Sequence, residues 1–164
     1  MAETRFTSDH FRKVLGHYPT GVSVITAAAD GRAAAMVVGT FTSVSLDPPL
    51  VGFLPDKGST SWPRIHESGR FCVNVLAADD AAVCMQMSAK GADKFSSVGY
   101  RLSENGSPIL DCALAWIDCD IVSISEAGDH LFVLGAVRDL ETQRQTEPMI
   151  FLGGKFGRFA AQDA

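Results

Sequence analysis

Residues 40–50 read Thr-Phe-Thr-Ser-Val-Ser-Leu-Asp-Pro-Pro-Leu, and this stretch decides the fold class. Its first seven positions are rich in β-branched, aromatic and hydroxyl side chains, which is typical of a strand. Asp47-Pro48-Pro49 then stops a hydrogen-bonded ladder, because proline has no N–H group. Residues 50–54 are expected to form a short buried strand. The stretch therefore predicts two strands separated by a sharp break.

Most of the remaining sequence also shows a strand pattern. From Gly21 the apolar period is two, and Asp30-Gly31 is a hairpin turn signal. Within 113–125 the residues alternate, which places Asp118 and Asp120 on a polar face. The first strand of the chain is predicted to start at Gly21, and further strands over 33–38, 71–76, 113–125, 131–137 and Met149–Leu152.

Three short helices are expected, one before the first strand and two between later strands. The first covers 8–17, with Ser8 as its N-cap and an end at Gly16 and Pro19. The second is capped by Ser59 or Thr60 and ends near Ser68-Gly69, and the third covers 79–90. Several strands, short helices and no regular βαβ alternation predict a mainly β fold, an antiparallel barrel.

Length, composition and charge bound the class of protein. The 164 residues fit one domain over 1–164, with a folded core over about 8–158 and short flexible termini. The net charge of −5 and the lack of a basic cluster argue against nucleic-acid binding. No secretory signal or apolar membrane span is found, so a cytoplasmic protein is expected. The four cysteines have no CxxC spacing and are expected to be buried free thiols.

Several catalytic motifs are missing from the sequence. There is no GxGxxG dinucleotide motif, no phosphate-binding GxxxxGK[ST] loop and no GxSxG elbow. The four histidines show no metal-ligand spacing, so no metal site is predicted.

Four other segments could carry chemistry, each with a structural alternative. Four hydroxyls within residues 40–45 could contact a flavin ring and phosphate, or form the solvated face of an edge strand. Asp129 could hold the imidazole of His130, or His130 could simply cap a turn. Residues 153–156 could close over a planar ligand or form an ordinary hairpin, and Lys90 and Lys94 could bind phosphate or be solvated.

Taken in order, these segments resemble the short flavin reductases that supply reduced flavin to two-component monooxygenases. No single motif is specific, but their combined order over about 150 residues is. The matching residues are Phe11-Arg12 with Gly16, Thr20-Gly21-Val22 with Val24-Ile25-Thr26, Phe41 with Ser43 to Val51, Phe71 with Val73 to Leu76, Asp93-Lys94-Phe95, Gly106 with Pro108, Gly128-Asp129-His130 with Gly135 and Val137, and Gly154-Lys155-Phe156.

The resemblance implies a Greek-key split β-barrel with short peripheral helices that binds FMN or FAD, with the flavin near the interface of a homodimer. It implies a loop at 88–94, with Lys90 and Lys94, near the phosphate or ribityl chain. His130 matches a catalytic histidine beside the nicotinamide of NADH or NADPH, and Gly154, Lys155 and Phe156 match a segment that closes on the dinucleotide. The implied flavin contacts are Val37, Val38, Gly39, Thr40, Phe41, Ser43, Val44, Gly58, Ser59, Thr60, Arg64 and Ile65.

Some positions depart from the family pattern. Family members often have a polar residue at the position of Gly39, and Ser and Phe at the positions of Cys84 and Met87. The closing aromatic is commonly Tyr, whereas Phe156 lacks a hydroxyl. The resemblance implies hydride transfer from a nicotinamide to a flavin, with a monooxygenase as the recipient of the reduced flavin and no nucleic-acid or membrane partner. Alternatives are another split-barrel flavoprotein (pyridoxamine-phosphate-oxidase-like or deazaflavin-dependent) and a non-catalytic flavin-binding module.

Overall fold

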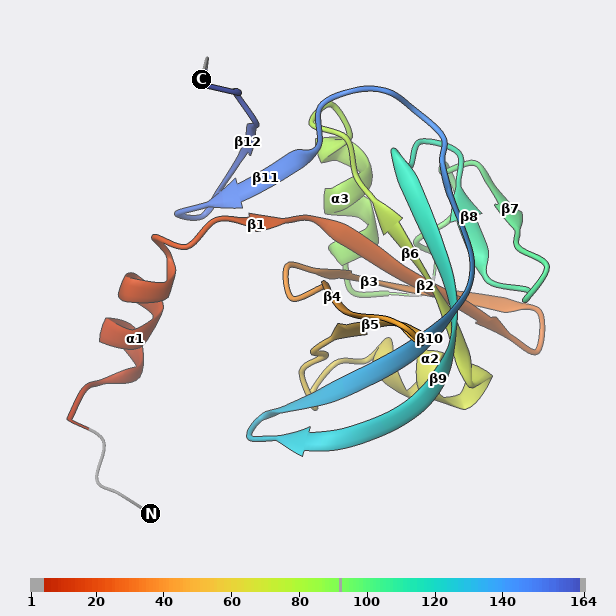
Figure 1. Cartoon of the computed structure of the whole chain (residues 1–164), viewed down its shortest axis with the longest axis horizontal. Coiled ribbons are helices and arrows are strands. Elements are labelled where there is room, and N and C mark those ends of the chain that lie inside the picture. Colours follow the sequence, from red (N-terminus) through yellow and green to blue (C-terminus); the bar gives the residue numbers. More distant parts are fainter. Residues whose placement is uncertain (1–4, 92, 163–164) are drawn as a thin grey trace.

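Seven antiparallel strands form one curved sheet in the computed structural model, which describes residues 5–91 and 93–162 (Figure 1). In the part of the chain so described, β3 and β4 are the two ends of the sheet and do not pair with each other, so the barrel is split. The predicted mainly β, split antiparallel barrel is confirmed. Across the sheet the strands are β3 (Arg32–Val38), β2 (Ser23–Ala29), β6 (Arg70–Val75), β9 (Ala115–Ala127), β10 (His130–Thr142), β5 (Pro49–Phe53) and β4 (Thr42–Leu46).

Smaller elements surround the barrel. Two short sheets and three helices are attached to it, and none of the described helices is long and apolar enough to span a membrane. Figure 1 shows α1 standing clear of the barrel, whereas α2 and α3 lie against it. These elements are β1 (Thr20–Gly21), β11 (Met149–Leu152), β12 (Lys155–Arg158), β7 (Tyr100–Leu102), β8 (Pro108–Leu110), α1 (Ser8–Leu15), α2 (Trp62–Ser68) and α3 (Ala81–Ser88).

The core lies on both faces of the sheet. Phe53 and Phe71 meet edge to face with ring centroids 5.0 Å apart inside the barrel, and α2 adds Trp62 and Ile65 to the same cluster. On the other side, Cys84 and Met87 of α3 pack in a second buried cluster. As expected, the cysteines are free thiols, and three of the four are buried. The sheet is therefore covered by α2 on one side and by α3 on the other.

The turns follow the residues predicted to make them, with two corrections. Asp30 and Gly31 have φ of 50° and 72°, so the predicted hairpin turn is confirmed. The N-cap of α1 is Thr7 and not Ser8, because the Thr7 hydroxyl accepts the hydrogen bond from the amide of His10 at 3.2 Å. Pro49 does not end the ladder but begins β5, a strand position at which proline is tolerated.

The face of β9 that carries Asp118 and Asp120 is not wholly exposed to solvent. Asp118 is 1% exposed, because the unpredicted β7–β8 hairpin covers this part of β9. In the loop of that hairpin, Asn105 donates to the carboxylate of Asp120 at 2.9 Å. Burial raises the pKa of Asp118 above its usual value, while Ser103 and Ser107 partly offset this effect. A strand pattern shows which side chains share a face, but it does not show what covers that face.

Candidate functional site

A continuous groove runs along the open edge of β3. It consists of three adjoining cavities of about 300, 230 and 210 Å³. The first two share Thr60, Ser61, Lys90 and Lys94, and the second and third share Val37 and Ser88. We call this feature the β3 groove. Its opposite walls are the loop before α2 and the end of α3.

The edge of β3 offers backbone hydrogen-bonding groups to this groove. Lys94 Nζ donates to the carbonyl of Ala35 at 2.8 Å, so this carbonyl faces away from β2. In an antiparallel strand, alternate residues direct both backbone groups to the same side. Ala33, Ala35 and Val37 therefore present their N–H and C=O groups to the groove. Apart from the Ala35 carbonyl, which Lys94 already contacts, such groups on an edge strand are suited to bind a ligand with several polar atoms.

The loop before α2 is fixed by local hydrogen bonds. The Asp56 carboxylate accepts from the amide of Gly58 at 2.6 Å, and the Ser59 hydroxyl accepts from the amides of Ser61 and Trp62 at 3.3 Å each. The N-cap of α2 is therefore Ser61 and not the predicted Ser59 or Thr60, although the Ser59 hydroxyl accepts from the amide of Trp62, the first residue of the helix. Gly58, Ser59 and Thr60 line the groove, as do the three residues after α3 that face them.

Three cations line one end of the groove. Arg64, Lys90 and Lys94 all border the first cavity, and none of them has a carboxylate at ion-pair distance among residues 5–91 and 93–162. Lys94 is held in place, because it also donates to the Ser61 hydroxyl at 3.1 Å. Burial lowers the pKa of Lys94. In a chain of net charge −5, this end is suited to bind an anion such as a phosphate.

The other end of the groove is apolar. Gly39, Cys84 and Phe156 line it together with Val37 and Val38. A Cβ atom on Gly39 would lie 2.8 Å from the Thr20 hydroxyl, which accounts for the small residue at this position. Burial raises the pKa of Cys84, so its thiol stays protonated and packs as an apolar group. A ligand that fits both ends is planar and apolar at one end and anionic at the other.

The hairpin that carries Phe156 is fixed at its base and at its tip. Arg158 on β12 pairs with Glu147 at 3.1 Å and also with Asp79. At the tip, the amide of Gly153 donates to the carbonyl of Gly16 at 3.1 Å. The predicted hairpin at 153–156 is thus confirmed, and its Phe156 lines a cavity, while closure of this segment over a ligand stays a prediction.

Not every predicted flavin contact faces the groove. Ile65 is fully buried in the core, so it supports Arg64 rather than reaching a ligand. The Thr40 hydroxyl accepts from the amide of Leu54 at 3.0 Å, and Phe41 packs against the core cluster. Ser43 and Val44 lie on the exposed edge strand β4. The predicted contacts that do line the groove are Val37, Val38, Gly39, Gly58, Ser59, Thr60, Arg64, Lys90 and Lys94.

His130 lies at the turn between β9 and β10. Its Nδ1 is 2.7 Å from the Asp129 carboxylate, so the expected Asp–His contact is confirmed. This hydrogen bond lowers the pKa of Asp129. The turn contacts the loop that leads to Gly58, because the amide of Lys57 donates to the carbonyl of Asp129 at 3.0 Å. Figure 1 shows this turn well separated from the β11–β12 turn, so one chain does not bring His130 and Phe156 together.

Sequence reasoning missed some of the residues that line the groove. Ala33, Ala34 and Ala35 contribute to it, and so do Ser61 and Ser88. Apolar residues of a strand carry no signal of ligand binding, and their backbone groups are free only because β3 is an edge strand. The order of strands in the sheet was needed to find them.

Comparison with known proteins identifies the class. The family model described as "Flavin reductase like domain" matches residues 15–160. A flavin reductase from Pseudomonas putida is 55% identical over 152 residues, covering 92% of this chain and 89% of that protein. The structure of nitrilotriacetate monooxygenase component B from Mycobacterium thermoresistibile has a TM-score of 0.91 at 38% identity, covering 95% of this chain and 90% of that one.

A second solved structure agrees. The NADH:FAD oxidoreductase SgcE6 of Streptomyces globisporus has a TM-score of 0.88 at 35% identity, covering 98% of this chain and 99% of that chain. The fold and the groove thus define a split-barrel oxidoreductase. More narrowly, the chain belongs to the flavin reductase family.

Proposed function

We propose that this protein transfers hydride from NADH or NADPH to FMN or FAD bound in the β3 groove. The observation that carries the proposal is the groove itself, which is apolar at Phe156, cationic at Lys94 and lined between them by free backbone groups. When bound, the flavin supplies the redox chemistry by accepting at N5 the hydride that leaves C4 of the nicotinamide.

The residues of the groove bind and orient the flavin. The N–H and C=O groups of Val37 would hydrogen-bond the polar edge of the ring, while Gly39 would allow close approach. Ser59 and Thr60 lie between the two ends, where the hydroxyls of the ribityl chain would be bound. Lys94 and Lys90 would bind the phosphate.

His130 and Phe156 would act on the nicotinamide side. Phe156 is 41% exposed at the mouth of the apolar cavity and would pack on the dinucleotide. Lys155 and Gly154 would set the path of this closing segment. His130 would orient the nicotinamide, with Asp129 fixing its imidazole, and need not transfer a proton.

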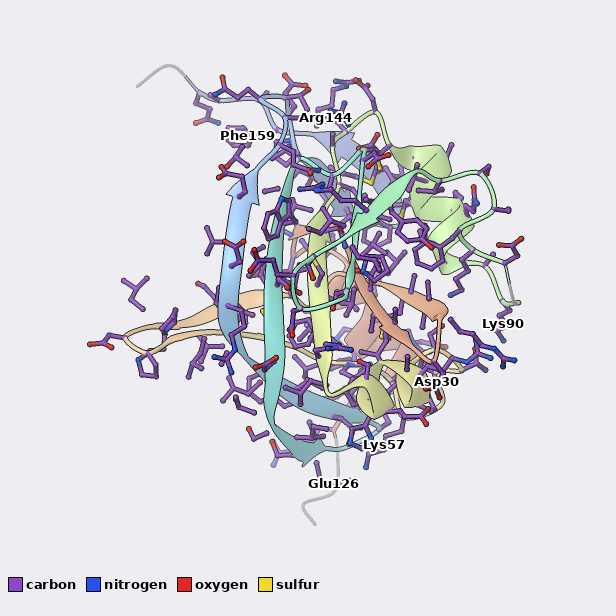
Figure 2. All side chains as sticks on the ribbon, turned by 90° about the vertical axis from the view of Figure 1, so that its right-hand side faces the viewer. Asp30, Lys57, Lys90, Glu126, Arg144 and Phe159 are labelled. Atoms are coloured by element: carbon purple, nitrogen blue, oxygen red, sulfur yellow. The ribbon has the colours of Figure 1, made fainter. Side chains whose placement is uncertain are left out.

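A homodimer would complete the site. α1 buries none of its residues, and Phe11, Val14 and Leu15 are each about half exposed. The β4–β5 hairpin, shown in pale orange in Figure 2, projects from the barrel with Leu46 95% exposed. Such apolar surfaces are typical of protein interfaces. A second copy of the chain that packs against these surfaces would bring its Ser43 and Val44 near the flavin of the first copy. It would also bring its His130 there, which lies far from Phe156 within one chain.

The reduced flavin would leave for a separate monooxygenase component in the cytoplasm. The match to a monooxygenase component B supports this role. Modest flavin affinity is expected of a protein that delivers its product to a partner.

Steady-state oxidation of NADH and of NADPH with FMN, FAD and riboflavin in turn tests the proposal. NADH or NADPH oxidation that depends on added flavin is expected, and anaerobic mixing should bleach the flavin absorbance. No flavin-dependent oxidation with either nucleotide would contradict it. His130→Ala should raise the nicotinamide KM more than the flavin Kd, whereas the control His66→Gln, on the exposed side of α2, should change neither. An unchanged nicotinamide KM and rate in His130→Ala would remove His130 from the site.

A further inference from the structure

The loop before α2 connects the β3 groove with the turn between β9 and β10. Its middle residues, 58–60, line the second cavity of the groove. Nearer its start, Asp56 forms an isolated antiparallel bridge with His130. One residue, Lys57, thus separates the residue that pairs with His130 from the part of the loop that lines the groove. We call residues 55–61 the linking loop.

The start of the linking loop is held against the β9–β10 turn by three contacts. The amide of Leu131 donates to the carbonyl of Pro55, which is buried, at 3.0 Å. On the other side of the bridge, the amide of Lys57 donates to the carbonyl of Asp129, also at 3.0 Å. The Lys57 ammonium group pairs with the carboxylate of Glu126, and Figure 2 shows these two side chains next to each other. The backbone of the turn is therefore positioned by this loop.

Further hydrogen bonds connect Asp56 to the groove side of the loop. Its carboxylate accepts from the amide of Gly58 at 2.6 Å, and its carbonyl accepts from the amide of Ser59 at 3.0 Å. The Ser59 hydroxyl accepts from the amide of Ser61 at 3.3 Å. The hydroxyl of Ser61 accepts in turn from Lys94 Nζ at 3.1 Å. A series of hydrogen bonds along one short loop thus leads from the β9–β10 turn to the cationic end of the groove.

The Asp56 carboxylate fixes the conformation of this loop. An aspartate that accepts from the amide two residues further on reproduces the hydrogen bond of a backbone turn. Asp56 is exposed, so this contact holds the turn rather than filling the core. Without the carboxylate, the backbone around Gly58 would sample other conformations. Because the same short segment pairs with His130, a change in the turn at Gly58 would displace His130 as well.

We infer that Asp56 is a positioning residue for hydride transfer, whose carboxylate holds the linking loop so that one end places His130 for the nicotinamide while the other lines the flavin groove. The inference rests on the proposed function, because it requires His130 on the nicotinamide side and a flavin in the β3 groove. In the proposed homodimer, His130 of one copy serves the flavin of the other. The linking loop therefore connects the two sites of the dimer.

Two variants of Asp56 and a matched control test the inference. Asp56→Ala removes the acceptor for the Gly58 amide, whereas Asp56→Asn keeps an oxygen that can accept the same hydrogen bond. With saturating FMN, Asp56→Ala should raise the KM of NADH, or of NADPH if that is the faster donor, about three- to tenfold, and Asp56→Asn less than about twofold. The control Asp139→Ala removes an exposed carboxylate that accepts from the amide of Leu140 at 2.9 Å on β10, and it should leave the KM unchanged.

A double variant shows whether Asp56 acts through His130. In a chain that already carries His130→Ala, adding Asp56→Ala should no longer raise the nicotinamide KM, because residues that act as one unit are not additive. The Kd of FMN, measured by fluorescence without nucleotide, should rise with Asp56→Ala in both backgrounds, since the loop also lines the groove. A merely destabilised fold would instead raise the KM again in the double variant.

The inference and the proposed function fail in different ways. An unchanged nicotinamide KM or FMN Kd in Asp56→Ala, no recovery in Asp56→Asn, or additive effects with His130→Ala would each overturn the inference while flavin reduction by the wild type stands. If the wild type shows no flavin-dependent oxidation of NADH or NADPH, the proposed function itself fails. Thermal unfolding of each variant shows whether it is folded. If Asp56→Ala does not fold, Glu126→Gln removes the ion-pair partner of Lys57 and should raise the KM about twofold or more, again only where His130 is present.

Discussion

Replacing Lys94 with Met tests the phosphate end of the groove most directly. An ammonium group has three N–H donors, and the carbonyl of Ala35 and the hydroxyl of Ser61 take two of them, at 2.8 and 3.1 Å. The third donor remains for a ligand. Methionine keeps a flexible chain of similar length but removes the charge and every donor.

The expected loss follows from this geometry. A charge-assisted hydrogen bond to a phosphate contributes about 1.5–3 kcal/mol, and each 1.4 kcal/mol is about tenfold in affinity. Lys94 is only partly buried, so solvent screening places the effect near the lower limit. Lys94→Met should raise the Kd of FMN and FAD roughly 10- to 30-fold and leave riboflavin, which has no phosphate, within about twofold.

Fluorescence titration of the three flavins measures this change, with Lys90→Met as the matched control. Lys90 borders the same cavities but is exposed and makes no hydrogen bond within residues 5–91 and 93–162, so a loss below about fivefold is expected. If Lys94→Met weakened riboflavin and FMN equally, Lys94 would act by shaping the groove and not by binding phosphate. If FMN affinity were unchanged, the assignment of the cationic end would be wrong.

Two further predictions follow from pKa and packing. Burial lowers the pKa of Lys94, so FMN affinity should fall as the pH rises, at a lower pH than that at which an ordinary lysine loses its proton. Riboflavin affinity should not change over the same range. Binding titrations from neutral to alkaline pH measure both affinities. For the same reason the unfolded chain binds this proton more tightly, so Lys94 makes the free energy of unfolding rise with pH in that range. Gly135→Ala should lower the free energy of unfolding by about 1–3 kcal/mol in urea denaturation, because the new Cβ would lie 2.4 Å from the Phe71 ring. The control is Gly157→Ala, since no atom lies within 4 Å of a Cβ built at Gly157. Equal free energies of unfolding for the two variants would refute the packing argument.

The sequence predicted the barrel well because its signals are local. Alternation and turn residues such as Asp30-Gly31 depend only on neighbouring positions, and the structure confirms that turn. The burial of Asp118 was not predicted, because it depends on β7 and β8, two strands of three residues that are too short to show a period.

The candidate site was predictable only in part, for a related reason. Lys94 and Thr60 carry functional groups that a motif can point to, whereas Ala35 takes part through its backbone on an edge strand. Ile65 and Arg64 are adjacent in sequence, yet helix geometry directs one into the core and the other toward the groove. If every residue of such a motif is counted as a ligand contact, the number of contacts is therefore overestimated.

The two ends of the groove also explain how a reductase of this kind can bind a flavin and still release it. The proposed phosphate contact at Lys94 would not depend on the redox state of the ring, so it would contribute equally to substrate and product binding. The ring end is shallow, since Phe151 and Phe156 are 40% and 41% exposed, and less buried apolar area means weaker ring binding. Arg158 fixes the base of the β11–β12 hairpin, and the amide of Gly153 at its tip donates a hydrogen bond to the carbonyl of Gly16, the C-cap of α1. A small shift of that tip would uncover the ring without breaking the phosphate contacts, so the ring end is where release of the reduced flavin is expected to begin.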